Sequence, residues 1–166
     1  LSNEIGRSGT DVVFRARTGV LGDIIDSSPT WVGAPSLPYS GTWKDTLYPA
    51  AMMLENSTPY ATFASSNATR TNVVYAGAND GFVHAFRSGA EDSLGNVINN
   101  SSTPNDGAEV LAYMPASVLN TIHNSNSSLD FSNPQYAHAF FVDATPGTGD
   151  LYYNSSWHTW LVGGLG

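Results

Sequence analysis

The sequence contains no cysteine and few basic residues, and these absences limit what the protein can bind. A cysteine-free domain of this size can be stable inside or outside the cell, so the redox compartment stays open. Six Lys and Arg against 14 Asp and Glu give a net charge of −8, without any basic cluster. Because nucleic-acid binding relies on neutralising phosphate groups, we expect no nucleic-acid partner.

Long apolar runs are also absent, and this argues against a membrane span. No run approaches the roughly 18 residues that a transmembrane helix needs, and residues 1–7 lack the basic and apolar regions of a signal peptide. Charged residues make up only 12% of the chain, which predicts little amphipathic helix. Loops rich in Asn and Ser with sparse Lys favour an exported bacterial surface protein.

The length of 166 residues is that of one ordinary domain. The chain begins at Leu1, and its last residues, 161–166, run from an apolar strand pattern directly into glycines. We therefore expect a natural protein that continues on both sides. We expect residues 1–166 to form a single segment, in which 1–20 form a linker or a preceding strand.

The clearest local structure is a hairpin over residues 72–86. Asn79, Asp80 and Gly81 tolerate a positive φ, which a tight turn between twisted strands requires. We predict that these three residues form a structural turn.

The strand after this turn carries a row of aromatic rings. Phe82, His84 and Phe86 share one face of the strand, and Val83 and Ala85 share the other. With bulky or apolar side chains on both faces, the strand is predicted to be buried on both sides.

Three further segments show strand patterns. Residues 22–33 hold two short apolar stretches separated by Ser-Ser-Pro, and Pro29 confines a strand there to an edge or to its first residue. Residues 137–143 and 157–164 read as strands, joined by a Gly-rich loop over 144–150 that carries Asp150.

Helix signals are few and short. Residues 114–123 predict one or two helical turns that begin at a proline. A second helix is expected within 47–64, interrupted at Pro49 and Pro59, and residues 88–107 and 124–134 read as long exposed loops. The pattern is that of a mainly all-β protein: a sandwich, a barrel or a β-propeller. About eight to ten strands would make two or three propeller blades of four strands each.

Residues 73–86, Val-Val-Tyr-Ala-Gly-Ala-Asn-Asp-Gly-Phe-Val-His-Ala-Phe, resemble the blade hairpin of the PilY/PilC family of type IV pilus-associated proteins. Four other blocks resemble that family in the same order along the chain. Their shared order is more specific than any single block. These blocks are residues 21–29, 107–115, 141–146 and 157–164.

The resemblance implies a seven-bladed, modified β-propeller at the C-terminal part of a large exported protein. This chain would form roughly the first half of that propeller, an incomplete ring with a few short helices and long loops. The family implies a non-enzymatic structural and binding module that acts in pilus assembly, twitching motility and surface adhesion. Its implied partners are minor pilins or pilus tip proteins and a host or surface receptor. Its implied location is the cell surface or pilus tip, associated with the outer membrane.

Metal and catalytic signals are weak. The family has a calcium loop rich in Asp, but this chain has no Asp-x-Asp-x-Asp run, so any calcium site is expected elsewhere in the full-length protein. Asn79 and Asp80 fit turn chemistry better than cation binding. Asp143 and Asp150 flank the Gly-rich loop and suit either a metal or a turn.

No catalytic residue is assigned. The four histidines lack the spacing that would place two imidazoles together, and Asp23 and Asp26 lie near Ser27 and Ser28 without a Gly-x-Ser-x-Gly elbow. We expect no cofactor in this segment.

The contact surface is expected in a loop punctuated by Pro and Gly. Trp31, Tyr39 and Trp43 lie there and are the candidate contact residues, whereas the aromatic residues on strands are expected in the core.

Two alternatives remain at this point. The hairpin is also similar to blades of quinoprotein dehydrogenases, whose propellers hold pyrroloquinoline quinone and calcium. A hallmark of those enzymes is a vicinal Cys-Cys pair, and this chain has no cysteine. The other alternative is a scaffold propeller that binds an unrelated protein.

Overall fold

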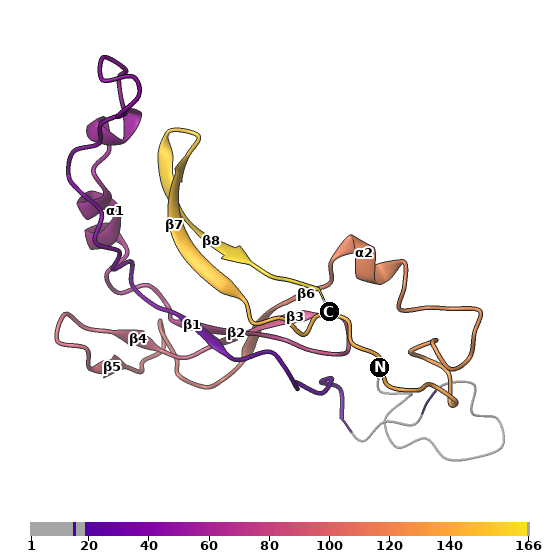
Figure 1. The fold of residues 1–166 in the computed structure, drawn as a ribbon. Coiled ribbons are helices and arrows are strands. Elements are labelled where there is room, and N and C mark those ends of the chain that lie inside the picture. Colours follow the sequence, from indigo (N-terminus) through magenta and orange to yellow (C-terminus); the bar gives the residue numbers. More distant parts are fainter. Residues whose placement is uncertain (1–14, 16–18, 166) are drawn as a thin grey trace.

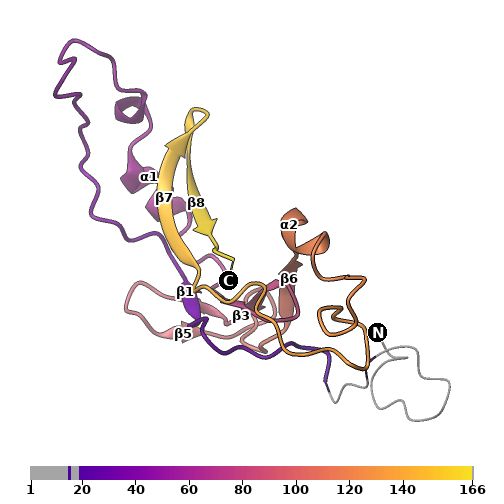
Figure 2. The ribbon, with the colours of Figure 1, turned by 45° about the vertical axis from the view of Figure 1, so that its right-hand side comes forward.

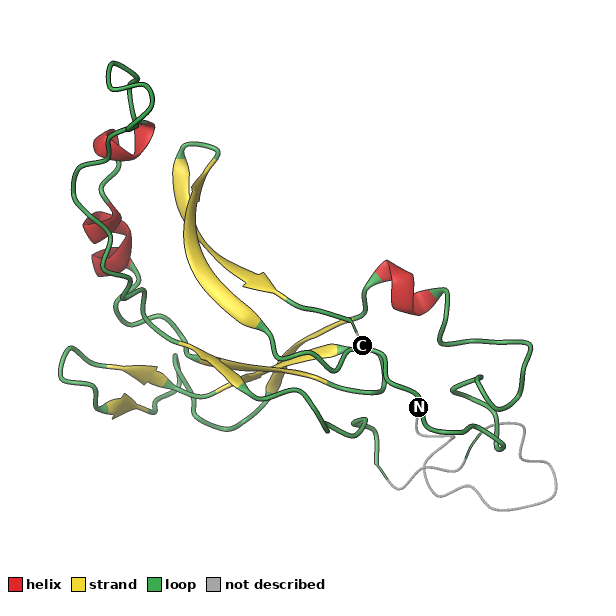
Figure 3. Cartoon of the chain, in the orientation of Figure 1, coloured by secondary structure: helices red, strands yellow, loops and turns green. Residues whose placement is uncertain are grey.

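The computed structural model describes Arg15 and residues 19–165, which form short strands and long loops with little helix (Figures 1 and 3). The mainly β fold predicted from the sequence is confirmed. The described elements, in chain order, are β1 (Thr30–Val32), the 3₁₀ helix η1 (Leu54–Ser57), α1 (Tyr60–Ser66), β2 (Val73–Gly77), β3 (Val83–Arg87), β4 (Ala90–Glu91), β5 (Val97–Ile98), β6 (Glu109–Tyr113), α2 (Ala116–Leu119), β7 (Gly147–Tyr153) and β8 (Ser156–Val162).

The main sheet has four strands in the order β1-β2-β3-β6, and every neighbouring pair is antiparallel. The β2–β3 hairpin is the one predicted over residues 72–86. Four antiparallel strands are the usual content of a propeller blade. The main sheet therefore has the composition of one blade.

A second, two-stranded sheet consists of β7 and β8, which rise away from the main sheet as a long curved hairpin (Figures 1 and 2). Its lower end lies beside the main sheet, where β7 contacts β1. None of the described sheets closes on itself. The arrangement is that of an open, partial propeller.

The apolar core lies where the β2–β3 hairpin meets α2 and the chain before β7. Val83, Val118, Phe141 and Val142 form its buried centre. Removing these side chains from water is the main favourable contribution to folding. Partly buried apolar residues surround them: Tyr75, Met114, Ile122, Phe131, Tyr136, Ala139 and Leu161.

The region before β8 differs from the sequence prediction. Residues 137–143 are not a strand, and the expected loop over 144–150 instead leads into β7, so Asp150 lies in a strand. The β7–β8 turn is formed by Asn154 and Ser155, which both have positive φ, as a two-residue turn matched to strand twist requires. With the turn there, β7 pairs with β8 from Gly147 to Tyr153.

The expected helices are present and short. Residues 114–123 contain α2, while residues 47–64 contain η1 and the start of α1, which are separated by Pro59. The expected loop over 88–107 is wrong in part, because it includes the β4–β5 hairpin. The longest described helix, α1, has seven residues, and none of the described helices is long and apolar enough to cross a bilayer.

Gly81 is the position where the main hairpin depends most on glycine. Its φ is +92°, and a Cβ added there would lie 2.9 Å from Val118 Cγ1 and 3.0 Å from Ile122 Cδ1. We predict that Gly81→Val lowers the free energy of unfolding by about 1 kcal/mol or more, because it adds both backbone strain and overpacking. Thermal and urea unfolding would measure the loss.

Gly95 provides a matched control for this substitution. Its φ is +80°, but nothing lies within 4 Å of a Cβ added there. Gly95→Val should therefore report the backbone strain alone and cost less than Gly81→Val. Equal losses for the two variants would show that packing around Gly81 contributes nothing.

Candidate functional site

The predicted turn residues lie between β2 and β3, at the centre of a buried polar network. The N–H of Ala78 donates to the carbonyl of Phe82 over 3.0 Å, and the N–H of Gly81 donates to the carbonyl of Ala78 over 3.2 Å. Asn79 and Asp80 are both buried, which is unusual for a hairpin turn because turns normally lie at the surface. Their side chains therefore need partners within the protein.

The Asp80 carboxylate has three hydrogen-bonding partners within the protein. It accepts hydrogen bonds from the backbone N–H of Gly22 over 2.7 Å and of Phe82 over 3.2 Å. His84 Nε2 lies 3.1 Å from Asp80 Oδ2. The carboxylate thus holds the chain near Gly22 against the hairpin, 58 residues away in sequence.

Asn79 makes the matching set of contacts on the other side of the turn. Its backbone N–H donates to the Asp23 carbonyl over 3.0 Å, and its side-chain carbonyl accepts the N–H of Phe141 over 3.3 Å. Asp23 also binds His138 Nε2 at 2.6 Å. Burial raises the pKa of Asp23, but the hydrogen bonds from His138 and Asn79 outweigh it and leave that pKa below its ordinary value.

His84 lies buried between two carboxylates. Its Nδ1 is 2.5 Å from Glu109 Oε1, and its Nε2 faces Asp80. Each contact requires a hydrogen between nitrogen and oxygen, because both atoms otherwise present lone pairs. When both contacts are satisfied, the three groups together keep a single net negative charge.

A β-bulge positions Glu109 for this contact. Ala85 pairs with Leu111 and Phe86 pairs with Glu109, so Val110 is an extra residue in β6. Without the bulge, Glu109 and Ala112 would point to opposite faces, because side chains alternate along a strand. With it, both residues line one cavity of about 560 Å³ with His84.

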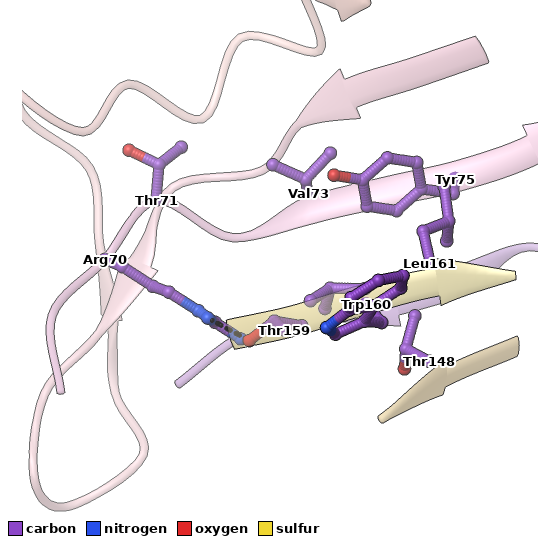
Figure 4. A pocket seen from close by; sticks show the side chains of 9 residues that line it. Arg70, Thr71, Val73, Tyr75, Thr148, Thr159, Trp160 and Leu161 are labelled. Atoms are coloured by element: carbon purple, nitrogen blue, oxygen red, sulfur yellow. Dashed lines mark hydrogen bonds between the residues drawn. The ribbon is translucent and has the colours of Figure 1, made fainter. Parts of the chain in front are cut away.

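A second polar network surrounds Asp150 in β7. Its carboxylate accepts hydrogen bonds from the Tyr60 hydroxyl over 2.5 Å and the Thr159 hydroxyl over 2.6 Å. Arg70 Nη1 donates to the same Thr159 oxygen over 2.7 Å, as Figure 4 shows, and Arg70 Nε donates to the carbonyl of Gly33 over 2.6 Å. The network joins β7 and β8 to α1 and to the chain after β1.

The predicted contact residues have different surroundings. Tyr39 and Trp43 are half-buried, with ring centroids 5.4 Å apart, and each also packs against Trp157 of β8. Trp31 lies in β1 with 50% of its surface exposed. The structure therefore brings Tyr39 and Trp43 together in an aromatic cluster and leaves Trp31 on a sheet surface.

Sequence reasoning did not find the two carboxylate networks. No sequence motif pointed to the other members of these networks, because their partners lie between 9 and 90 residues away. These members are Glu109, Tyr60, Arg70 and Thr159. Among the described residues, no group of three or more His, Asp or Glu is arranged to hold a metal ion. The carboxylates of both networks instead bind neighbouring N–H and O–H groups.

The family described as the PilY1 beta-propeller domain matches residues 21–166. The chain belongs to this family. Its four-stranded sheet and open arrangement fit part of such a propeller, and the resemblance inferred from the ordered blocks is confirmed.

Curated PilY1 relatives extend over nearly the whole chain. The type IV pilus biogenesis factor PilY1 of Pseudomonas aeruginosa strain PAO1 is 35% identical over 153 residues, covering 92% of this chain and 11% of the relative. A PilY1 homolog of Xylella fastidiosa is 33% identical over 154 residues, covering 92% of this chain and 10% of the relative. The chain thus spans about a tenth of the length of these relatives. No solved structure gave a significant match.

The Asp150 network leads to a prediction at alkaline pH. Burial and the hydrogen bond to Asp150 raise the pKa of Tyr60 from 10.0 to about 12. The folded state therefore holds this proton more tightly than the unfolded state, and the resulting stability is present below pH 10 and lost as the pH rises towards 12. We predict a fall in melting temperature over that range that is shallower in Tyr60→Phe.

Tyr152→Phe is the control for this measurement, because the Tyr152 hydroxyl donates a long, exposed hydrogen bond of 3.4 Å to the carbonyl of Leu54. It should keep the wild-type pH profile. Parallel melting curves for wild type and Tyr60→Phe from pH 9 to pH 12 would contradict the assignment. Both variants retain the ring, so packing changes are small.

Proposed function

We propose that this chain is a non-enzymatic structural and binding module of a type IV pilus biogenesis factor. The observation that carries the proposal is the match of residues 21–166 to the PilY1 propeller domain, together with curated relatives named as pilus biogenesis factors. In this proposal the module acts in pilus assembly, twitching motility and surface adhesion. Its partners are minor pilins or pilus tip proteins and a surface receptor, at the cell surface or pilus tip.

The physical features of the chain support a binding role. Loops and hairpin tips leave large apolar side chains in water, among them Leu47 at 82% and Met52 at 86% exposure. Both belong to the long arm between β1 and α1, which extends far from the main sheet (Figures 1 and 2). Exposed apolar groups on a projecting arm are typical of surfaces that contact other proteins.

Polar networks of the kind seen here also suit a scaffold. The Asp80 and Asp150 carboxylates are occupied by hydrogen bonds that hold separate segments together. A catalytic carboxylate needs a free approach to substrate. The two networks therefore favour a structural role for these acids.

The genetic test uses the bacterium that encodes the protein. Removing the gene should reduce the number of surface pili in electron micrographs and the diameter of twitching zones, and the intact gene should restore both. Restoration with Gly81→Val should be weaker than with Gly95→Val, because a less stable module is less abundant. Normal piliation and twitching without the gene would refute the proposal.

The quinoprotein alternative leads to a separate prediction. We expect the intact protein to show no saturable binding of pyrroloquinoline quinone in the presence of calcium, measured by quinone absorbance and calorimetry. A purified quinoprotein dehydrogenase serves as the positive control. Saturable binding with alcohol-dependent dye reduction would show that the module is part of an enzyme.

A further inference from the structure

A pocket between the main sheet and the β7–β8 hairpin has a chemistry that the pilus role does not explain (Figure 4). It measures about 190 Å³. One wall comes from β1, β2 and the residues just before β2, and the other comes from β7 and β8. Both walls therefore belong to the described chain, and the pocket is a space between two sheets of that chain.

Arg70 gives this pocket a positive charge. Its Nε donates to the carbonyl of Gly33 and its Nη1 donates to the Thr159 hydroxyl, and both acceptors are neutral. Its Nη2 has no hydrogen-bond partner in the described chain, and its guanidinium forms no ion pair there. Arg87, in contrast, binds both oxygens of Asp106. The Arg70 guanidinium therefore keeps free donors and an unpaired charge.

The acid in the same network lies behind Thr159. The Asp150 carboxylate accepts the hydroxyls of Tyr60 and Thr159, and neither Asp150 nor any other acidic residue lines this pocket. A ligand at Arg70 Nη2 would contact the guanidinium directly, whereas the Thr159 side chain would separate it from Asp150. Because Coulomb energy falls with distance, the attraction of an anion to Arg70 outweighs its repulsion by Asp150.

Hydroxyl groups on both walls add neutral donors. Thr71 and Tyr75 line the pocket on the β2 side, and Thr148 lines it on the β7 side (Figure 4). None of these three hydroxyls has a hydrogen-bond partner in the part of the chain that the structure describes. Hydroxyl and guanidinium donors form strong hydrogen bonds with carboxylate oxygens. This set of donors favours an oxyanion over a cation.

The rest of the pocket is apolar and limits the size of the ligand. Val32, Val73 and Leu161 contribute aliphatic side chains to its walls. An apolar cavity of about 150 Å³ is known to hold benzene, so a pocket of about 190 Å³ has room for one ring or a short branched chain beside a carboxylate. Apolar walls with a few placed polar groups are typical of small-molecule sites.

We propose that this pocket binds a small organic monocarboxylate, with the carboxylate at Arg70 and the apolar part against Val73 and Leu161. Such a ligand would contact both the main sheet and the β7–β8 hairpin, so it would stabilise the junction between the two sheets. The site goes beyond the proposed pilus function and does not depend on it, because it follows from the residues of the pocket.

The test measures binding of benzoate and isobutyrate to the intact protein by ligand-observed NMR titration at constant ionic strength. Benzamide and isobutyramide are the comparison ligands, because each keeps the shape and removes the charge. We expect at least one carboxylate to bind at least about 5-fold more tightly than its amide and to raise the melting temperature. Equal affinity within both pairs, or no saturable binding of either carboxylate, would overturn the proposal.

Inorganic anions separate the proposed ligand from a general anion site. Sulfate and phosphate carry charge without an apolar part, so they should bind more weakly than the carboxylate. Binding of either anion that is as tight as that of the carboxylate would show that the apolar walls contribute nothing, and would also overturn the proposal.

A carboxylate attached to the chain tests the charge of the pocket without any ligand. Thr148→Glu places a carboxylate among the pocket residues, and Thr148→Gln is its neutral match. We expect Thr148→Glu to melt at a higher temperature than Thr148→Gln and to block benzoate and isobutyrate. Thr46→Glu and Thr46→Gln, at an exposed position outside the pocket, should melt alike. A melting temperature for Thr148→Glu no higher than for Thr148→Gln would contradict the proposed charge preference.

Removing a hydroxyl locates the ligand. Tyr75→Phe keeps the ring and removes one donor of the pocket, so it should weaken carboxylate binding by at least about 3-fold. Tyr153→Phe makes the same change at an exposed site outside the pocket and should leave binding unchanged. Carboxylate binding that survives unchanged in both Tyr75→Phe and Thr148→Glu would place the ligand elsewhere and overturn the proposal. Arg70 stays in place in all variants, because it also holds Gly33 and Thr159.

Discussion

Much of the main sheet depends on one constraint: the buried carboxylate of Asp80 must be satisfied inside the protein. An unpaired buried charge would cost several kcal/mol, on the order of the stability of a whole domain. The fold meets this cost with backbone N–H groups from Gly22 and Phe82 and with the imidazole of His84. Because Glu109 binds the other ring nitrogen, the same carboxylate indirectly orients the edge strand β6.

Asp150 has the corresponding role for the second sheet. Its contacts to Tyr60 and Thr159, and the contact of Arg70 with Thr159, hold the β7–β8 hairpin against the arm that contains α1. The buried centre of the apolar core is small, because it consists of four side chains: Val83, Val118, Phe141 and Val142. Two buried carboxylates therefore connect separate parts of the chain, and at Asp150 they act together with the packing of Tyr39 and Trp43 against Trp157.

Several large apolar side chains remain exposed on this structure. The polar networks hold the strands in place, so aromatic and apolar side chains such as Trp31 and Met52 are not all needed in the core. A propeller module with such surfaces is well suited to a family whose curated members are pilus biogenesis factors. The projecting arm between β1 and α1 is one such surface, with Leu47 and Met52 exposed on it.

Local signals in the sequence were sufficient for the mainly β fold, the main hairpin and the short helices. Asn79, Asp80 and Gly81 fit a turn from residue type alone, and the ordered blocks led to the family. The same reasoning misplaced the strand before β8, because Asn154-Ser155 is a weaker turn signal than the Gly-rich run that precedes it. A strand forms only with a partner strand, and neither the sequence of β7 nor that of β8 predicts by itself that the two will pair.

The sequence by itself determined the charge, the lack of cysteine and basic clusters, the positions of turn-forming residues and the family to which the chain belongs. Only the tertiary structure decided that Asp80 is buried, that His84 lies between the carboxylates of Asp80 and Glu109, and that a bulge at Val110 turns Glu109 towards His84. The physical reason is distance along the chain: residue type and alternation specify contacts between near neighbours. The N–H of Gly22 and the hydroxyl of Tyr60, which bind Asp80 and Asp150, come from 58 and 90 residues away, and only the folded chain brings them there.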